Sequence, residues 1–425
     1  MFILVSLGYF AFMIRFERHT LGNGLRVIAH RDEGTPMVTA NMLYDVGARD
    51  EDPESTGLAH LFEHLMFEGT RQVPQFDLPV MMAGGENNAF TNNDFTNYYI
   101  TLPVNNLETA FWLEADRMTG LDLSAERIAT QKSVVTEEYR QRYLNQPYGD
   151  LLLLLRPLAY RVHPYRWPAI GMDISHIDKA DTISARRFYR KFYNPANAVL
   201  SVAGNVTPGK VFRLAEKWFG DKPRAPRRRR RLPVEPVQSQ RREITVRRRV
   251  PSAQLIMAWH TDGRNSRDFI VLDMLTDILA GCESARFPAL LVRERELFSE
   301  ADIYLSGESD PGLVIFSGKL RNGADIFKAG KAVEQELGRL SADPVTDAEL
   351  DKARNRYESL RLISHLSASN KAFNLALHEL LGDAEEINRE KERYMSITAS
   401  EMAETAARTF LPGNCSVINY LPEEQ

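Results

Sequence analysis

The chain has 425 residues, of which 44% are hydrophobic and 26% charged, as is typical of a globular protein with two or more domains. Its formal net charge of −4 excludes an overall electrostatic attraction to nucleic acid or to an anionic membrane. Two cysteines, Cys282 and Cys415, are too few for a disulfide framework, so we expect both to be buried free thiols.

The first element is an apolar run over residues 2–14. It is shorter than the ~20 residues that span a bilayer, and it lacks the basic start and small-residue cleavage site of a signal peptide. A strand-like segment follows at once over residues 15–31, so we expect the run to be retained and packed on the protein. We predict no membrane span. The compartment stays open, with the cytoplasm favoured over the periplasm.

The pentapeptide His60-Leu61-Phe62-Glu63-His64 places two imidazoles and one carboxylate within little more than one helical turn. On a helix, positions 60, 63 and 64 share a face, because residues three and four apart are neighbours. Two such imidazoles can chelate zinc, and the carboxylate can take a proton from a zinc-activated water. The order H-x-x-E-H is that of the inverzincin metallopeptidases. The alternative is a solvated helix face that carries polar residues.

The residues around this motif favour a helix. Ser55 and Thr56 offer N-cap oxygens, and Gly69 is a stop signal at the C-terminal end. An apolar stripe with helical spacing lies opposite the motif and is formed by Leu58, Leu61, Phe62 and Leu65. We therefore expect a helix that packs by one face and carries the metal ligands on the other.

Residues 87–102 are rich in strand-forming side chains and are predicted to form an exposed edge strand. Such an edge can pair with an extended peptide through main-chain hydrogen bonds, with little demand on the peptide's sequence. The alternative is an ordinary edge strand that is blunted by its Asn and Asp residues.

A zinc site needs a third protein ligand, and the best candidates lie in a predicted helix over residues 124–143. The apolar stripe of this helix consists of Ile128, Val135 and Tyr139. Glu137 points about half a turn away from the stripe, whereas Glu138 borders it. A carboxylate at the edge of a buried face suits an interior metal, so Glu138 is preferred to Glu137.

The order of predicted elements indicates that the chain consists of two similar halves. Residues 183–206 are predicted to form a helix, a turn and an apolar strand, and residues 397–421 repeat that order. Residues 267–281 fall where the motif helix would lie in the second half, but the positions of its two histidines and glutamate hold Leu272, Leu275 and Thr276. We therefore predict that the second half is a duplicate without a metal site.

Between the halves, residues 223–240 are predicted to be an exposed linker rich in Pro and Arg. The arginine run at 227–231 could bind nucleic acid, but a solvated linker is favoured because stacking aromatic residues and an overall basic charge are missing. We predict a metal-binding catalytic domain over residues 15–222 and a homologous domain over residues 241–425. Strands and helices follow one another within each half, so the predicted class is α+β.

These motifs, in this order, resemble the pitrilysin–insulinase–mitochondrial processing peptidase family of zinc peptidases, and most of all its bacterial members of this length. The resemblance covers nearly the whole chain. The matching stretches are LGNGLRV at 21–27, GLAH at 57–60, FEGT at 67–70, GGENNAFT at 84–91, VVTEE at 134–138, NQPYG at 145–149, HPY at 163–165 and YNP at 193–195.

The resemblance implies that His60, His64 and Glu138 bind one zinc ion per chain and that Glu63 is the catalytic base. It also implies that each half is a mostly antiparallel sheet with helices on one face, and that the two halves enclose a cavity.

The resemblance points to Asn88 and Ala89 as substrate-binding residues. Gln131 departs from the family pattern, which usually has a second glutamate seven residues before the ligand. We expect Gln131 and Glu137 to support the ligands and not to bind the metal.

We therefore expect a zinc endopeptidase that acts on extended or unfolded peptides. Active single-chain relatives hold the substrate backbone with an Arg and a Tyr from the zinc-less half. The matching segment here, residues 310–327, has Val314 at the expected Arg position and no Tyr. Arg321 could be a displaced substitute, although a solvated turn residue is favoured. We predict a catalytic subunit that works with a homologous partner supplying the Arg/Tyr pair, or as a homodimer. The alternatives are a non-catalytic scaffold subunit of the same family and an RNA-binding protein.

Overall fold

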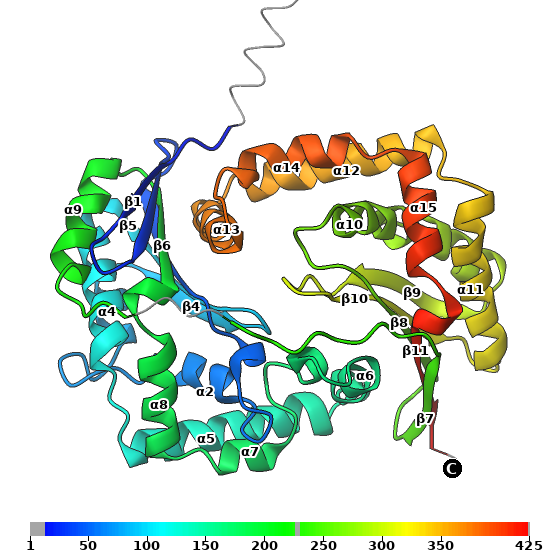
Figure 1. The fold of residues 1–425 in the computed structure, drawn as a ribbon, viewed down its shortest axis with the longest axis horizontal. Coiled ribbons are helices and arrows are strands. Elements are labelled where there is room, and N and C mark those ends of the chain that lie inside the picture. The colour runs from blue at the N-terminus through cyan, green and yellow to red at the C-terminus, as the bar shows by residue number, and fades with distance from the viewer. Residues whose placement is uncertain (1–12, 226–229, 424–425) are drawn as a thin grey trace, which may run out of the picture. The chain divides into compact units, whose positions relative to one another are not determined.

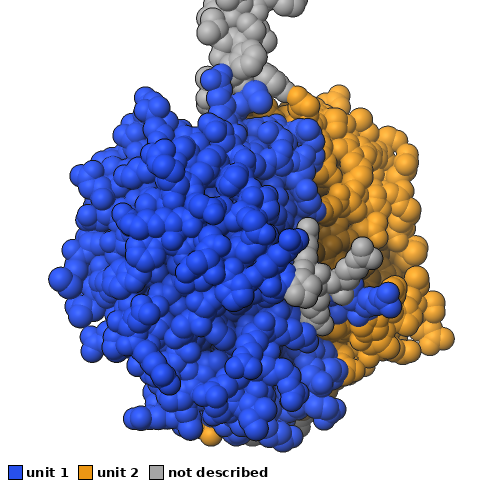
Figure 2. Space-filling view, turned by 60° about the vertical axis from the view of Figure 1, so that its left-hand side comes forward, with its two compact units in different colours: residues 1–139, 167–232, 360–389 blue, residues 140–166, 233–359, 390–425 orange. Residues whose placement is uncertain are grey.

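The computed structural model describes residues 13–225 and 230–423, and the chain divides into two compact units (Figure 2). Unit 1 takes its residues from 1–139, 167–232 and 360–389, and unit 2 from 140–166, 233–359 and 390–425. The predictions made for the apolar run up to residue 12 and for arginines 227–229 lie outside the described residues.

Unit 1 is built on a mixed sheet with the strand order β1-β2-β6-β3-β5-β4 (Figure 1). Its strands are β1 (Glu17–Thr20), β2 (Arg26–Arg31), β3 (Met37–Tyr44), β4 (Glu86–Thr91), β5 (Thr96–Pro103) and β6 (Ala198–Gly204). Strands β2 and β6 pair in parallel, and the other neighbours pair antiparallel. The predicted strand over residues 87–102 is therefore a hairpin, because a turn at 92–95 divides it into β4 and β5.

The helices of unit 1 are α2 (Leu58–Leu65), α3 (Asp77–Met82), α4 (Leu107–Gly120), α5 (Ala125–Tyr139), α7 (Ile174–Asp178), α8 (Thr182–Phe192), α9 (Pro208–Phe219) and α13 (Ala368–Leu381). Helix α5 is shorter than predicted, since the chain continues from Arg140 to Leu144 as a π-helical turn. Helices α4 and α9 lie on one side of the sheet and α13 on the other (Figure 1).

Unit 2 repeats the sheet of unit 1. Its strand order β7-β11-β8-β10-β9 follows the same path as β2-β6-β3-β5-β4, and its one parallel pair, β7 with β11, matches β2 with β6. The strands are β7 (Arg242–Arg248), β8 (Gln254–His260), β9 (Phe298–Leu305), β10 (Leu313–Leu320) and β11 (Cys415–Pro422). The predicted duplication and the α+β class are thus confirmed.

The helices in or bordering unit 2 are α6 (Leu151–Ala159), α10 (Arg267–Ala280), α11 (Ile326–Ala342), α12 (Asp347–Ser364), α14 (Glu386–Met395) and α15 (Ala399–Thr409). Helices α12 and α14 each run across the boundary between the two units.

Each sheet is covered on its second face by a helix from the other half of the chain. In unit 1, α13 places Leu375 and Leu377 against Leu43 and Val199 of the sheet. In unit 2, α6 packs in the same way against the β8 face that carries Ile256. Strand β8 needs cover on both faces, because every one of its residues except His260 is buried. The compact units therefore do not follow the boundaries 15–222 and 241–425, and the assignment of catalysis to the first of these ranges stays a prediction.

Three smaller features bear on the sequence predictions. In the described part of the chain, no helix is long and apolar enough to cross a membrane. Cys415 is buried as predicted, whereas Cys282 is only half-buried. The described residues of the linker from 233 to 240 form neither helix nor strand, and Val234 and Val237 are 86% and 93% exposed.

Candidate metal centre

Helix α2 carries the pentapeptide motif, as predicted. The four residues of its apolar stripe, Leu58, Leu61, Phe62 and Leu65, are all at most 8% exposed. Phe62 stacks on the aromatic rings of Phe188 and Tyr193, at centroid distances of 5.1 and 5.4 Å. This packing fixes one face of α2, so that the opposite face is free to carry polar side chains.

The start of α2 differs from the prediction. The N-cap residue is Gly57, at φ +92°, and it has no side-chain cap. Thr56 faces elsewhere, because its hydroxyl oxygen accepts a hydrogen bond from the Met172 amide at 2.8 Å and lies 2.9 Å from Nδ1 of His176. The helix also ends at Leu65, before the turn that leads to Gly69.

The structure brings His60, His64 and Glu138 together. Each offers one ligand atom, and these atoms all lie within 4.8 Å of one another. The Oε2 atom of Glu138 lies 3.6 Å from Nε2 of His60 and 3.3 Å from Nε2 of His64. The two imidazole rings are 4.9 Å apart, edge to face. Three donors that converge in this way fit a single divalent ion of zinc's size and ligand preference.

Helix α5 supplies the carboxylate of this cluster. Its predicted stripe of Ile128, Val135 and Tyr139 is buried, and α5 packs against α2. Glu138 lies at the edge of that stripe with a side chain 17% exposed, whereas Glu137 is an exposed residue. The helical phase therefore brings Glu138 to the two imidazoles and leaves Glu137 outside the cluster.

Glu63 is half-buried and lies next to His64 in the sequence of α2. Its negative charge interacts electrostatically with the buried phenols of Tyr98 and Tyr193, whose hydroxyl oxygens are 3.2 Å apart. Burial is the main cause that raises the pKa of both phenols, and the negative charge of Glu63 adds to it. Glu63 is not among the three groups that converge on the candidate metal position.

Gln131 contacts a residue that the sequence had not suggested. Its side-chain amide donates a hydrogen bond to the carboxylate of Glu68, which lies in the turn that follows α2. Arg127 approaches the same carboxylate at 3.6 Å. These contacts join α5 to the segment that follows His64 and so restrain α2 and α5 relative to one another.

Asn88 and Ala89 lie on β4, which is the edge of the unit 1 sheet in the described residues. Side chains of this strand alternate between exposed and half-buried, so Asn88 faces solvent while Ala89 faces the opposite side. Helix α2 packs against β4. The amide of Ala89 donates to the side-chain oxygen of Asn88 at 2.8 Å.

The second half lacks ligand chemistry at the positions that match the motif. Leu272, Leu275 and Thr276 on α10 are at most 7% exposed, and the two leucines belong to the hydrophobic core of unit 2. Val314 is fully buried in β10. Arg321 lies in the turn after β10, where its 44% exposed side chain pairs with Glu296 at 3.3 Å, as expected of a solvated turn residue.

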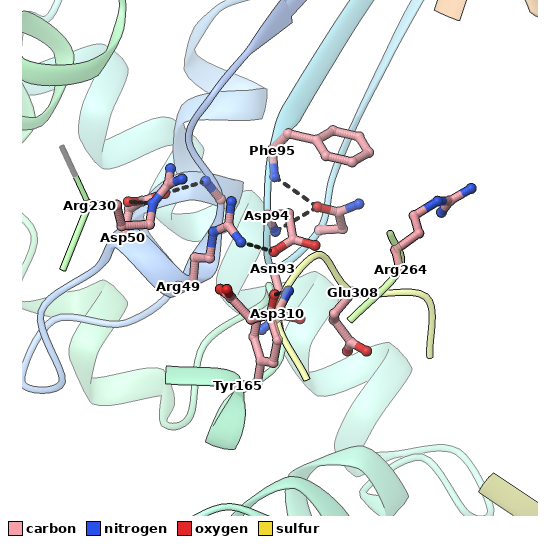
Figure 3. Close-up of polar contacts among 12 residues, drawn as sticks. Arg49, Asp50, Asn93, Asp94, Phe95, Tyr165, Arg230, Arg264, Glu308 and Asp310 are labelled. Carbon is pink, nitrogen blue, oxygen red and sulfur yellow. Dashed lines mark hydrogen bonds and ion pairs between the residues drawn. The ribbon is translucent and has the colours of Figure 1, made fainter. Parts of the chain in front are cut away.

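One arginine of the predicted solvated linker is not solvated. Arg230 is only 20% exposed in its side chain and forms an ion pair with Asp50 at 2.7 Å (Figure 3). It forms a second ion pair with Asp45 at 3.0 Å. These two carboxylates raise its pKa further, although burial alone would lower it. The expectation of a fully exposed linker is therefore wrong at this residue.

Comparison with known proteins shows which family this chain resembles. A family model described as Insulinase (Peptidase family M16) matches residues 26–166, and one described as Peptidase M16 inactive domain matches residues 184–357. The zinc protease PqqE of Helicobacter pylori is 29% identical over 425 residues, which cover 96% of this chain and 94% of the relative.

Two solved structures share the fold. A protease from Helicobacter pylori is 27% identical, with a TM-score of 0.91 over 96% of this chain and 100% of the other. The periplasmic protease PqqL of Escherichia coli is 17% identical, with a TM-score of 0.79 over 96% of this chain but only 47% of PqqL, a likeness in fold alone. Because both halves match models of a single family, in the expected order, the chain belongs to peptidase family M16, the pitrilysin–insulinase family.

Proposed function

We propose that this chain is a zinc-dependent endopeptidase that hydrolyses extended or unfolded peptides. The observation that carries the proposal is the convergence of His60, His64 and Glu138 within 4.8 Å. Two imidazoles and one carboxylate are the ligand set of catalytic zinc sites that keep their fourth position open for chemistry. The relatives' names, which describe zinc proteases, support the same reaction.

The residues of the site would have separate roles in the reaction. His60, His64 and Glu138 would hold the metal. Zinc bound there would supply a Lewis acid that polarises the scissile carbonyl and lowers the pKa of the attacking water. Glu63, on the same face of α2, would take the proton of that water and return it to the leaving amine.

The edge strand β4 supports extended peptides as substrates. It ends the unit 1 sheet, α2 packs against it, and an extended chain added to its edge would run close to the metal-binding helix. Pairing through main-chain groups demands an unfolded segment but little particular sequence. A folded protein without a free terminus or flexible loop would therefore be a poor substrate.

We further propose that the chain is the catalytic subunit of a pair. Val314 is buried in the core, and Arg321 is engaged with Glu296, so neither resembles a side chain held ready for a substrate. In fold, the chain corresponds to 47% of the length of PqqL, as expected if two such chains are needed for a complete enzyme. A homologous partner with an Arg/Tyr pair would complete the substrate clamp.

Metal analysis combined with peptide digestion tests the proposal. The purified chain should hold about one zinc ion. With a homologous partner present, it should cleave unfolded peptides, lose this activity to a chelator and regain it with zinc. If zinc is absent, or if zinc-loaded chain cleaves nothing with any homologous partner, the chain is a non-catalytic scaffold subunit.

A further inference from the structure

The first turn of α2 has no local cap. Gly57, in the left-handed conformation, replaces the usual Ser, Thr, Asp or Asn at the N-cap, and a side chain at this position would lie 2.8 Å from the carbonyl oxygen of Ile170. The first N–H groups of a helix have no partner within it. His60 is the third residue of α2, so the unprotected turn is the one that carries a proposed metal ligand.

Glu51 provides the missing partners from outside the helix. Its Oε2 atom accepts a hydrogen bond from the Gly57 amide at 2.9 Å, and its Oε1 atom accepts one from the Ala59 amide at 2.7 Å. The side chain is 7% exposed. Burial raises the pKa of this carboxyl to about 8, against the opposing effect of the hydrogen bonds it accepts. A buried carboxylate is costly, and here both oxygens serve the start of one helix.

Residues 48–50, which precede Glu51, each contact a distant part of the chain, and we call this set of contacts the bracket. The Trp167 indole N–H donates to the carbonyl oxygen of Ala48 at 2.9 Å. Arg49 pairs with Asp94 at 2.6 Å, with both side chains at most 7% exposed (Figure 3).

Asp50, the residue before Glu51, is fixed by Arg230. Two guanidinium nitrogens of Arg230 donate to the two oxygens of its carboxylate, at 2.7 and 2.8 Å (Figure 3). These contacts therefore join the connection between β3 and α2 to Arg230 of the linker, and they restrain the backbone at Glu51.

We propose that Glu51 is a positioning residue of the metal centre: by capping the first turn of α2 from a rigid bracket, it holds the His60 imidazole where it can share an ion with His64 and Glu138. The inference rests on the proposed zinc site. Loss of the cap leaves the N–H groups of Gly57 and Ala59 without this partner, and the turn that carries His60 frays. Partners that orient a metal ligand are typically worth ~10–100-fold in metal affinity.

A purely structural cap would behave differently. It would stabilise the fold as a whole, and its removal would lower the free energy of unfolding without a separate effect on the metal. Asp325 offers a matched control, because its carboxylate accepts hydrogen bonds from the Phe327 and Lys328 amides, at 2.8 and 3.0 Å, at the start of α11 in unit 2. Like Glu51, it caps two N–H groups, but it lies in the unit that does not carry the zinc motif.

The test compares Glu51→Gln with Asp325→Asn in the full chain. Zinc dissociation constants are measured by competition with a chelating dye, and the free energy of unfolding is measured on metal-free protein, so that bound zinc does not contribute to it. We expect Glu51→Gln to weaken zinc binding ~10–100-fold and Asp325→Asn to leave it unchanged. In cobalt-substituted protein, the visible spectrum should change only in Glu51→Gln.

A second variant, Glu51→Asp, keeps the carboxyl group but is too short to reach both amides, and it serves if Glu51→Gln fails to fold. It should show a smaller loss of zinc affinity in the same direction. Unchanged zinc affinity in either folded Glu51 variant overturns the inference, as does an equal loss in Asp325→Asn. A wild-type chain that binds no zinc would instead overturn the proposed function.

Discussion

Glu63 and Glu138 are both half-buried carboxylates, yet they have different neighbours. Glu138 lies within 3.6 Å of Nε2 of both His60 and His64, as expected if the three groups share a metal. Glu63 is excluded from that group and instead lies near the phenols of Tyr98 and Tyr193. At the scale of single residues, we therefore expect substitution of the two carboxylates to have different effects. Substitution of Glu63 should abolish activity but not zinc binding, and substitution of Glu138 should weaken zinc binding.

Glu63→Gln should keep zinc and lose activity. The amide retains the size and hydrogen bonding of the carboxylate but cannot accept the proton of the attacking water. Loss of a general base costs ~10²–10⁴-fold in rate. Zinc content and kcat are measured side by side on the variant and the wild type. Wild-type cleavage rates in the variant would show that another group is the base.

Glu138→Gln should weaken zinc binding strongly, whereas Glu137→Gln should leave it almost unchanged. The first variant removes a ligand oxygen from the cluster, and the second changes an exposed side chain one residue away. Competition with a chelating dye gives both zinc affinities. A stronger effect from Glu137→Gln would mean that the neighbouring carboxylate is the ligand in the metal-bound protein.

His365 should make the fold acid-sensitive. Burial is the main cause that lowers its pKa from the ordinary 6.5 to about 4, and the nearby charges of Arg361 and Lys371 add to the effect. Between these two pH values the unfolded chain binds a proton that the folded chain does not, so stability falls as the pH drops from 6.5 towards 4. Urea unfolding at pH 7 and pH 5 should show a smaller difference for His365→Gln than for wild type. An equal difference would exclude His365 as a source of the effect.

At the scale of elements, the β4 edge strand offers two interpretations that make opposite predictions. The Asn88 side chain accepts the amide hydrogen of Ala89 on this edge strand. If Asn88 only prevents unwanted pairing at the edge, its replacement exposes the Ala89 amide to a peptide, and KM for that peptide falls. If Asn88 contacts the substrate, its removal raises KM.

We predict the second outcome for Asn88→Ala. KM for an unfolded peptide should rise ~2–10-fold, the range expected for one net hydrogen bond, while zinc content stays the same. The variant and the wild type are assayed with the same partner chain and the same peptide. A lower KM would show that Asn88 protects the edge from unwanted pairing.

At the scale of the whole molecule, the two copies of the sheet carry helices with different side chains. Unit 1 carries the candidate metal ligands, whereas the equivalent helix of unit 2 buries Leu272 and Leu275 in its core. Each sheet also takes a covering helix from the other half of the chain, α13 in unit 1 and α6 in unit 2. The two halves therefore depend on one another for stability, although among the described residues only unit 1 contains a group of side chains that could hold a metal.

The chain should be weakly active alone and strongly active with a homologous partner that has the Arg/Tyr pair. Metal chemistry without a substrate clamp loses orientation, and poor orientation can cost ~10²-fold in rate. The purified chain is assayed on unfolded peptides before and after addition of such a partner. Full activity from the isolated chain, unchanged by any partner, would show that its own second half is sufficient.

Local sequence patterns by themselves determined the helices that carry the candidate site and the repeated order of elements. Helical spacing was enough to predict α2, its buried stripe and the common face of His60 and His64, because these features depend on neighbours within one turn. The phase of α5 was enough to prefer Glu138 to Glu137 for the same reason. The repeated order of elements predicted two copies of one sheet.

Only the tertiary structure decided which distant residues complete these elements. Glu51 caps α2 from outside the helix, and Arg230 pairs with Asp50 across 180 residues of sequence. Such contacts cannot be predicted from sequence periodicity, because they join residues that are distant in the sequence and meet only in the folded chain. The exchange of α13 and α6 between the halves was hidden for the same reason, since an apolar strand face shows that a cover is needed and not which helix provides it.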